Sequence, residues 1–118
     1  MWYILDENNI PVVANISAYV DWEEAYPEKR CLRQQHIGNI FISTVFLGLD
    51  HAHGSKTPLL WETMIFEGEH DQYQERYSNY EAALRGHDEA IKLVIGNSIK
   101  RYIMYQISCI ISKIKSIL

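Results

Sequence analysis

The chain lacks most of the features by which a sequence identifies an enzyme or an exported protein. Its 118 residues include only two cysteines, Cys31 and Cys109, which lie far apart and in no metal-ligand or redox spacing. This count excludes a disulfide scaffold and indicates a reducing compartment. The first residues carry no basic segment ahead of their apolar run, which argues against a signal peptide. We therefore expect a cytoplasmic protein.

Several catalytic motifs are also absent from the sequence. We find no glycine-rich phosphate loop, no nucleophile elbow, and no HExxH or deaminase-type pattern. No run of about eighteen uncharged apolar residues occurs, so no transmembrane helix is expected. A chain of this length forms one domain and is large enough to bury a core without disulfides.

Charge is distributed unevenly along the chain. Residues 1–90 contain 15 acidic and 6 basic residues, whereas residues 91–118 contain five basic residues and no acidic one. An acidic body repels the phosphate backbone of nucleic acids and suits a basic protein partner. The alternative is a solvated surface with no partner.

The first two thirds of the chain predict mainly strands. Short apolar runs at 2–5 and 10–13 suggest a small hairpin, and Asn15 can cap a helix that ends at Tyr26 and Pro27. Residues 31–49 then predict a hairpin with its turn at Gly38 and Asn39. A strand follows over residues 59–66, and a short edge strand over residues 74–77.

The last third predicts two helices. Residues 78–81 have the form of a capping box, with Ser78 as the cap, and the helix that follows places His87 on its apolar face. After an interruption at residues 96–98, helical spacing resumes with a row that we call the isoleucine stripe: Ile99, Ile103, Ile107, Ile110, Ile114 and Ile117. We predict an α+β fold: residues 1–95 form a single domain, an antiparallel sheet of three to five strands packed by a helix, and residues 96–118 form an amphipathic C-terminal helix.

The isoleucine stripe requires an apolar surface to cover it. It packs on its own domain as the last core helix, or it mediates self-association, or it lies on a membrane surface as a basic amphipathic helix. Of the alternatives to core packing we prefer self-association to a membrane, because the apolar face contains no tryptophan and the basic residues are few.

Four polar residues lie where the pattern predicts buried structure. Asp50 and His51 follow a strand, Glu62 lies within the strand 59–66 that is apolar on both faces, and His87 lies on the apolar helix face. A buried carboxylate takes a proton, pairs with a cation or binds a metal. A helix packed on this sheet would bring Glu62 and His87 into one layer. Imidazole and carboxylate ligands suit a divalent transition metal, most of all zinc, and His53 and His70 are weaker candidate ligands.

Each of the four residues also has a simpler interpretation, such as a core histidine bonded to a neighbour. With an open metal position the same set would support a metal-dependent hydrolase. We favour a structural or binding role for the site and assign no catalytic residue.

Three stretches of the sequence resemble a family of small, mostly uncharacterised proteins of bacteriophages and prophages. They are residues 43–51 (STVFLGLDH), residues 58–66 (PLLWETMIF), and Arg76, Tyr77 and Ser78 with Glu81, Ala82, Gly86 and His87. The family pattern includes the positions of Asp50, His51, Glu62 and His87. By analogy with small acidic phage proteins, the resemblance implies an anti-defence protein in the host bacterial cytoplasm. Such a protein, of the anti-CRISPR type, would bind a host nuclease through acidic residues such as Glu67, Glu69 and Asp71.

A further alternative is a protein that sequesters small defence nucleotides. It would require a basic pocket, for which Arg76, Arg85 and Arg101 are candidates.

Overall fold

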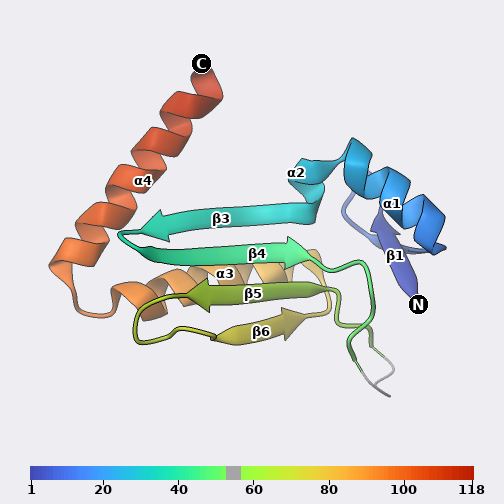
Figure 1. The fold of residues 1–118 in the computed structure, drawn as a ribbon, viewed down its shortest axis with the longest axis horizontal. Coiled ribbons are helices and arrows are strands. Elements are labelled where there is room, and N and C mark those ends of the chain that lie inside the picture. Colours follow the sequence, from blue (N-terminus) through green and yellow to red (C-terminus); the bar gives the residue numbers. More distant parts are fainter. Residues whose placement is uncertain (53–56) are drawn as a thin grey trace.

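A four-stranded antiparallel meander forms the centre of the fold in the computed structural model, which describes residues 1–52 and 57–118 (Figure 1). Its strands pair in the order β3 (Cys31–Ile37), β4 (Ile40–Phe46), β5 (Trp61–Phe66) and β6 (Gln74–Tyr77). Gly38 takes a positive φ of 63° in the tight turn between β3 and β4. The α+β class, the antiparallel sheet and the C-terminal helix are therefore confirmed.

The N-terminal segment forms a small unit at one end of the sheet. Strands β1 (Trp2–Leu5) and β2 (Pro11–Ala14) pair antiparallel, and helices α1 (Ile16–Ala25) and α2 (Pro27–Arg30) follow. The Asn15 side chain accepts a hydrogen bond from the Ala18 amide at 2.8 Å and caps α1 as expected. Tyr19 and Trp22, on the inner side of α1, are buried against Phe46 and the rest of this end of the core.

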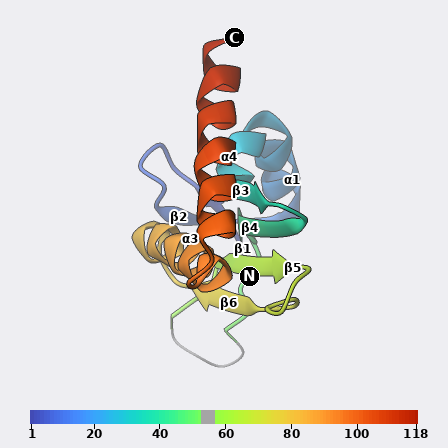
Figure 2. The ribbon, with the colours of Figure 1, turned by 90° about the vertical axis from the view of Figure 1, so that its left-hand side faces the viewer.

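Helix α3 (Tyr80–Ile95) lies across one face of the sheet (Figures 1 and 2). Its N-cap is Asn79, whose side chain accepts from the Ala82 amide at 2.8 Å. The expectation that Ser78 caps this helix is therefore wrong by one residue, because the short Asn79 side chain reaches the third amide after it. The helix ends at Gly96, which takes a positive φ of 52°.

Helix α4 (Ile99–Ile117) starts beside the β3–β4 turn and extends beyond the edge of the sheet (Figures 1 and 2). Met104 and Tyr105 pack against the core of the body, and Cys109 lies close to β3, whereas every residue from Ile110 onward is exposed. The isoleucine stripe is exposed as well, by 50% at Ile107 and 82% at Ile117. The stripe is therefore not part of the core of this chain. In the described residues no helix is apolar and long enough to span a membrane.

Two apolar clusters fill the space between the sheet and its covering elements. The first lies toward α1 and the second toward α4. Three of the buried polar side chains, Thr44, Thr63 and His87, are fully buried and belong to neither cluster. Thr44 and Thr63 are directly paired across β4 and β5. The members of the first cluster are Leu5, Tyr19, Trp22, Phe46, Leu60, Trp61 and Ala83, and those of the second are Ile37, Ile40, Ile42, Ile65, Ala90, Ile91 and Val94.

Only one face of β5 is covered by a helix. Trp61, Thr63 and Ile65 face α3 and are fully buried, whereas Met64 and Phe66 on the other face are only partly buried. A strand that is apolar on both faces is expected to be covered on both sides, but a helix covers only one side of β5. Large side chains on the neighbouring strands, such as Phe41 stacked on Phe66, shield the second face instead.

Candidate functional site

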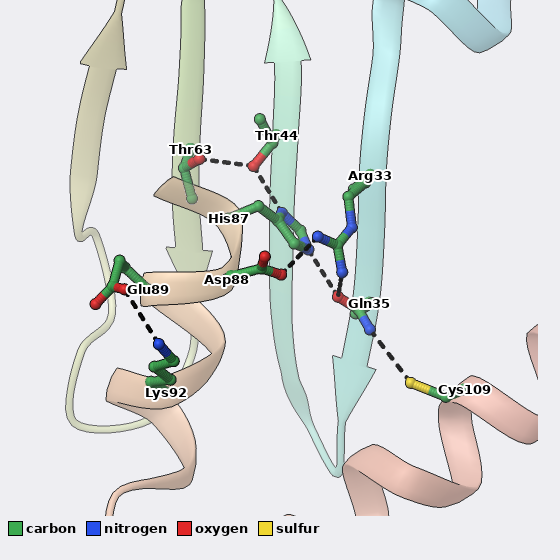
Figure 3. Close-up of polar contacts among 9 residues, drawn as sticks. All are labelled: Arg33, Gln35, Thr44, Thr63, His87, Asp88, Glu89, Lys92 and Cys109. Carbon is green, nitrogen blue, oxygen red and sulfur yellow. Dashed lines mark hydrogen bonds and ion pairs between the residues drawn. The ribbon is translucent and has the colours of Figure 1, made fainter. Parts of the chain in front are cut away.

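A chain of hydrogen bonds runs through the sheet side of the core, with His87 at its centre (Figure 3). The Thr44 hydroxyl lies 2.7 Å from His87 Nδ1 and 2.6 Å from the Thr63 hydroxyl. On the other side of the ring, His87 Nε2 lies 2.7 Å from Gln35 Oε1. The Gln35 amide nitrogen donates to Cys109 Sγ at 3.8 Å. This series of hydrogen bonds thus joins residues from β3, β4, β5, α3 and α4.

The Gln35 carbonyl oxygen fixes the direction of this chain, because that oxygen can only accept. His87 Nε2 must therefore carry the proton, and Nδ1 accepts from the Thr44 hydroxyl. Thr44 in turn accepts from Thr63. Both ring nitrogens of His87 are therefore satisfied within the protein.

His87 is neutral over the physiological pH range. Its side chain is fully buried, and burial lowers its pKa from the ordinary 6.5 to about 4. The nearby Arg33 guanidinium is a smaller cause of this lowered pKa, and the Asp88 carboxylate partly opposes both effects. Arg33 Nη1 lies 2.6 Å from Asp88 Oδ1, so these two charges largely compensate one another.

Glu62 lies on the opposite face of the sheet from His87. Successive residues of a strand alternate faces, so Glu62 points away from α3 while Thr63 joins the His87 chain. The Glu62 carboxylate is only 11% exposed and accepts from Gln74 Nε2 at 2.5 Å and from Arg76 Nε at 3.0 Å. Of the outcomes expected for a buried carboxylate, pairing with a cation is the one observed. The expectation that Glu62 and His87 share a layer is wrong.

Asp50 and His51 lie beyond the end of β4. Asp50 Oδ1 accepts from the amides of Ala52 at 2.8 Å and Leu59 at 3.1 Å, and these hydrogen bonds lower its pKa. The carboxylate thereby ties the two ends of the β4–β5 connection together. His51 is partly buried, and its backbone amide donates to the Leu59 carbonyl at 3.3 Å. His53 lies outside the described residues.

The structure thus places Asp50, His51, Glu62 and His87 in separate surroundings. Within residues 1–52 and 57–118, no three His, Cys, Asp or Glu side chains are grouped so that they could hold a metal ion. Glu62 and His87 have the sheet between them and cannot bind the same ion in this arrangement. The zinc site stays a prediction, and no observation on these residues favours the hydrolase that would use them.

The acidic residues expected to bind a partner lie in the turn between β5 and β6. Glu67, Glu69 and Asp71 are all exposed. Asp71 Oδ1 accepts from the Glu67 amide at 2.7 Å, and the Asp71 amide donates to the Gly68 carbonyl at 3.2 Å. Glu69 lies 3.7 Å from Arg101 Nη1 and 3.4 Å from His70 Nε2. The turn is therefore held in shape by its own hydrogen bonds and presents carboxylates to solvent.

A groove of about 740 Å³ lies between the open edge of β3 and the inner side of α4. The charged residues among its described lining, Arg33, Lys113 and Lys115, are all basic. Sequence reasoning did not identify this groove or the role of Gln35 and Cys109. The only signal was the polar alternation of residues 31–36, which does not tell which helix packs beside the strand. The candidate arginines Arg76, Arg85 and Arg101 do not line this groove.

Comparison of the chain with protein-family models, with curated proteins and with solved structures finds no match.

Proposed function

We propose that the protein is a phage or prophage anti-defence protein of the anti-CRISPR type, which binds and inhibits a basic host nuclease through the acidic turn between β5 and β6. The observation that carries this proposal is the arrangement of Glu67, Glu69 and Asp71, three exposed carboxylates on one turn. The resemblance to phage proteins supports the class of protein. The acidic turn lies at the end of the molecule that is remote from α1 (Figure 1).

The shape of the turn favours binding because its backbone is fixed before a partner arrives. Glu67 has a positive φ of 73°, and its amide is bonded to the Asp71 side chain. Neither Glu67 nor Asp71 forms an ion pair with another described residue, so both carboxylates can accept from lysines and arginines of a partner. Fixed charges of one sign speed the approach of an oppositely charged surface and exclude like-charged partners.

Charge reversal at the turn tests the proposal. The double variant Glu67→Lys, Glu69→Lys leaves Asp71 in place to support the turn, and Glu24→Lys is a single-charge control at the other end of the molecule, on the exposed side of α1. A nuclease captured from a host lysate is purified, and its binding and cleavage are titrated with each variant. We expect the double variant to bind at least about tenfold more weakly, which corresponds to about 1.4 kcal/mol, and the control to bind like the parent.

Salt provides a second readout of the same contact. Binding through exposed charges weakens as ionic strength rises, mostly through a slower association rate. Equal affinity of the double variant and the Glu24→Lys control, or binding that does not respond to salt, would refute the role of the turn.

A second candidate function follows from the basic groove between β3 and α4. Lys113 and Lys115 are suited to a small phosphate-bearing ligand, as a nucleotide-sequestering protein requires, and Arg33 lies beside them in its ion pair with Asp88. Calorimetric titration with a nucleoside triphosphate and with a cyclic dinucleotide tests it. Lys113→Glu with Lys115→Glu should abolish the heat of binding, whereas Lys100→Glu, outside the groove, should not. Absence of heat with the parent protein would rule this function out.

A further inference from the structure

We propose that α4 pairs with α4 of a second copy of this chain, antiparallel, through the isoleucine stripe. This inference is independent of the nuclease and nucleotide proposals. It rests on the direction in which the stripe faces, on the spacing of its residues and on the placement of the lysines in α4.

The isoleucine stripe faces away from the body of its own chain. The partly buried residues of α4, which lie on the side of the body, are Arg101, Met104, Tyr105, Ser108 and Cys109. At 3.6 residues per turn, the middle of that row lies roughly 170° around the helix from the middle of the isoleucine stripe. The described body therefore cannot cover the stripe while α4 keeps its contact with β3.

The spacing of the stripe is that of a seam between helices. Ile103, Ile107, Ile110, Ile114 and Ile117 follow one another at four, three, four and three residues, which is the a and d pattern of a coiled coil. Their exposed fractions range from 50% to 82%. Six isoleucines exposed to this degree offer several hundred Å² of apolar surface on each chain, on the order of the roughly 800 Å² per partner of a standard interface.

The position of Lys100 selects the antiparallel orientation. Lys100 occupies the a position one heptad before Ile107, so two parallel helices would place Lys100 directly against Lys100 of the second copy. In the antiparallel arrangement a positions face d positions, and Lys100 meets Ile117 near the last turn of the other helix. The negative end of the helix dipole lies there and favours a cation.

The remaining charges of α4 favour a second copy over a lipid surface. Arg101 is held by the body, since its Nη1 donates to the Val94 carbonyl at 3.0 Å and lies 3.7 Å from Glu69. Lys115 lines the groove on the inner side of the helix. Of the four basic side chains of α4, Arg101 and Lys115 are thus directed toward the body, which leaves only Lys100 and Lys113 beside the stripe to meet anionic headgroups.

An isologous pair of this kind also keeps the two bodies apart. The residues of α4 that are partly buried against the body all precede Ile110. Antiparallel helices therefore carry their bodies at opposite ends of the pair. The two-fold axis then passes between the helices near the middle of the stripe.

The first experiment measures the mass of the full chain by light scattering after gel filtration over a hundredfold range of concentration. We expect twice the 13.8 kDa of one chain. Ile110→Lys should convert the protein to monomer, whereas Ser112→Lys should not, because it adds the same charge two residues away on the opposite side of α4. Far-UV circular dichroism confirms that both variants keep their helices. A monomer at all concentrations, or equal effects of the two variants, overturns the proposal.

The second experiment tests orientation by cross-linking, in a background where serine replaces Cys31 and Cys109. Ile103→Cys and Ile114→Cys are made separately, then mixed and oxidised. Antiparallel pairing predicts a cross-linked product in the mixture well above that of either variant alone. If each variant alone gives as much cross-linked dimer as the mixture, the antiparallel arrangement is overturned. If the parent protein stays monomeric and binds vesicles of phosphatidylglycerol and phosphatidylcholine, the isoleucine stripe is a membrane-binding surface and the proposed pairing is overturned.

Discussion

Acidification should destabilise the fold mainly through His87. The pKa of this side chain is about 4 in the folded protein and about 6.5 in the unfolded chain, so the unfolded chain binds a proton first as the pH falls. The stability that His87 contributes as a neutral group is therefore fully present above pH 6.5 and is lost as the pH falls toward 4. Linkage gives a loss of about 2 kcal/mol in the free energy of unfolding between pH 7.5 and pH 5.

A variant that cannot titrate isolates this contribution from that of the other histidines. His87→Gln keeps one acceptor and one donor for Thr44 and Gln35 at similar side-chain length. We expect its free energy of unfolding to be lower than that of the parent at pH 7.5 by about 1–2 kcal/mol, because the replaced hydrogen bonds are less well aligned. Between pH 7.5 and pH 5 its stability should fall about 2 kcal/mol less than the parent's.

Urea denaturation at a series of pH values measures this difference, and nitrogen NMR of the imidazole reports the tautomer directly. The structure requires a proton on Nε2 and none on Nδ1 down to pH 5. A His87 ring that titrates near pH 6.5, or carries its proton on Nδ1, refutes the hydrogen-bond direction. Equal pH dependence of the parent and His87→Gln refutes the assignment of the acid sensitivity to His87.

Three further predictions concern packing, charge and metal content. Gly86→Ala should lower the free energy of unfolding by about 1–3 kcal/mol, because a Cβ at this buried position would overlap the Tyr77 hydroxyl. This loss should outweigh the better helix propensity of alanine. Arg85→Ala is the exposed control at the neighbouring position, and urea denaturation measures both variants. Arg76→Met should cost about 2 kcal/mol by leaving the Glu62 carboxylate without its cation, and Glu62→Gln should cost less; equal losses in thermal melts would contradict this explanation. Elemental analysis of protein purified without added metal tests the zinc prediction, which fails if no transition metal is present in stoichiometric amount and chelation leaves the melting temperature unchanged.

Most of the fold could be predicted because its signals are local. The Gly38 turn, the Asn15 cap and the break at residues 96–98 each depend on residues adjacent in sequence, and the structure has all three. The burial of His87 followed from its place on an apolar helix face. The hydrogen-bond partners of His87 could not be predicted, since strand and helix packing that no sequence period encodes brings Gln35 and Thr44 to its ring and Cys109 to Gln35.

The error over Glu62 has a specific physical origin. A strand that is apolar on both faces does not reveal which face a single helix will cover. Here Thr44 and Thr63, which are paired across β4 and β5, lie on the covered face and provide the hydroxyl groups that a buried neutral histidine needs. His87 would leave a ring nitrogen unsatisfied against a purely apolar face, at a cost of about 1–3 kcal/mol. The two threonines therefore favour this face for α3, together with the apolar residues that pack beneath the helix, and Glu62 pairs with Arg76 on the other side.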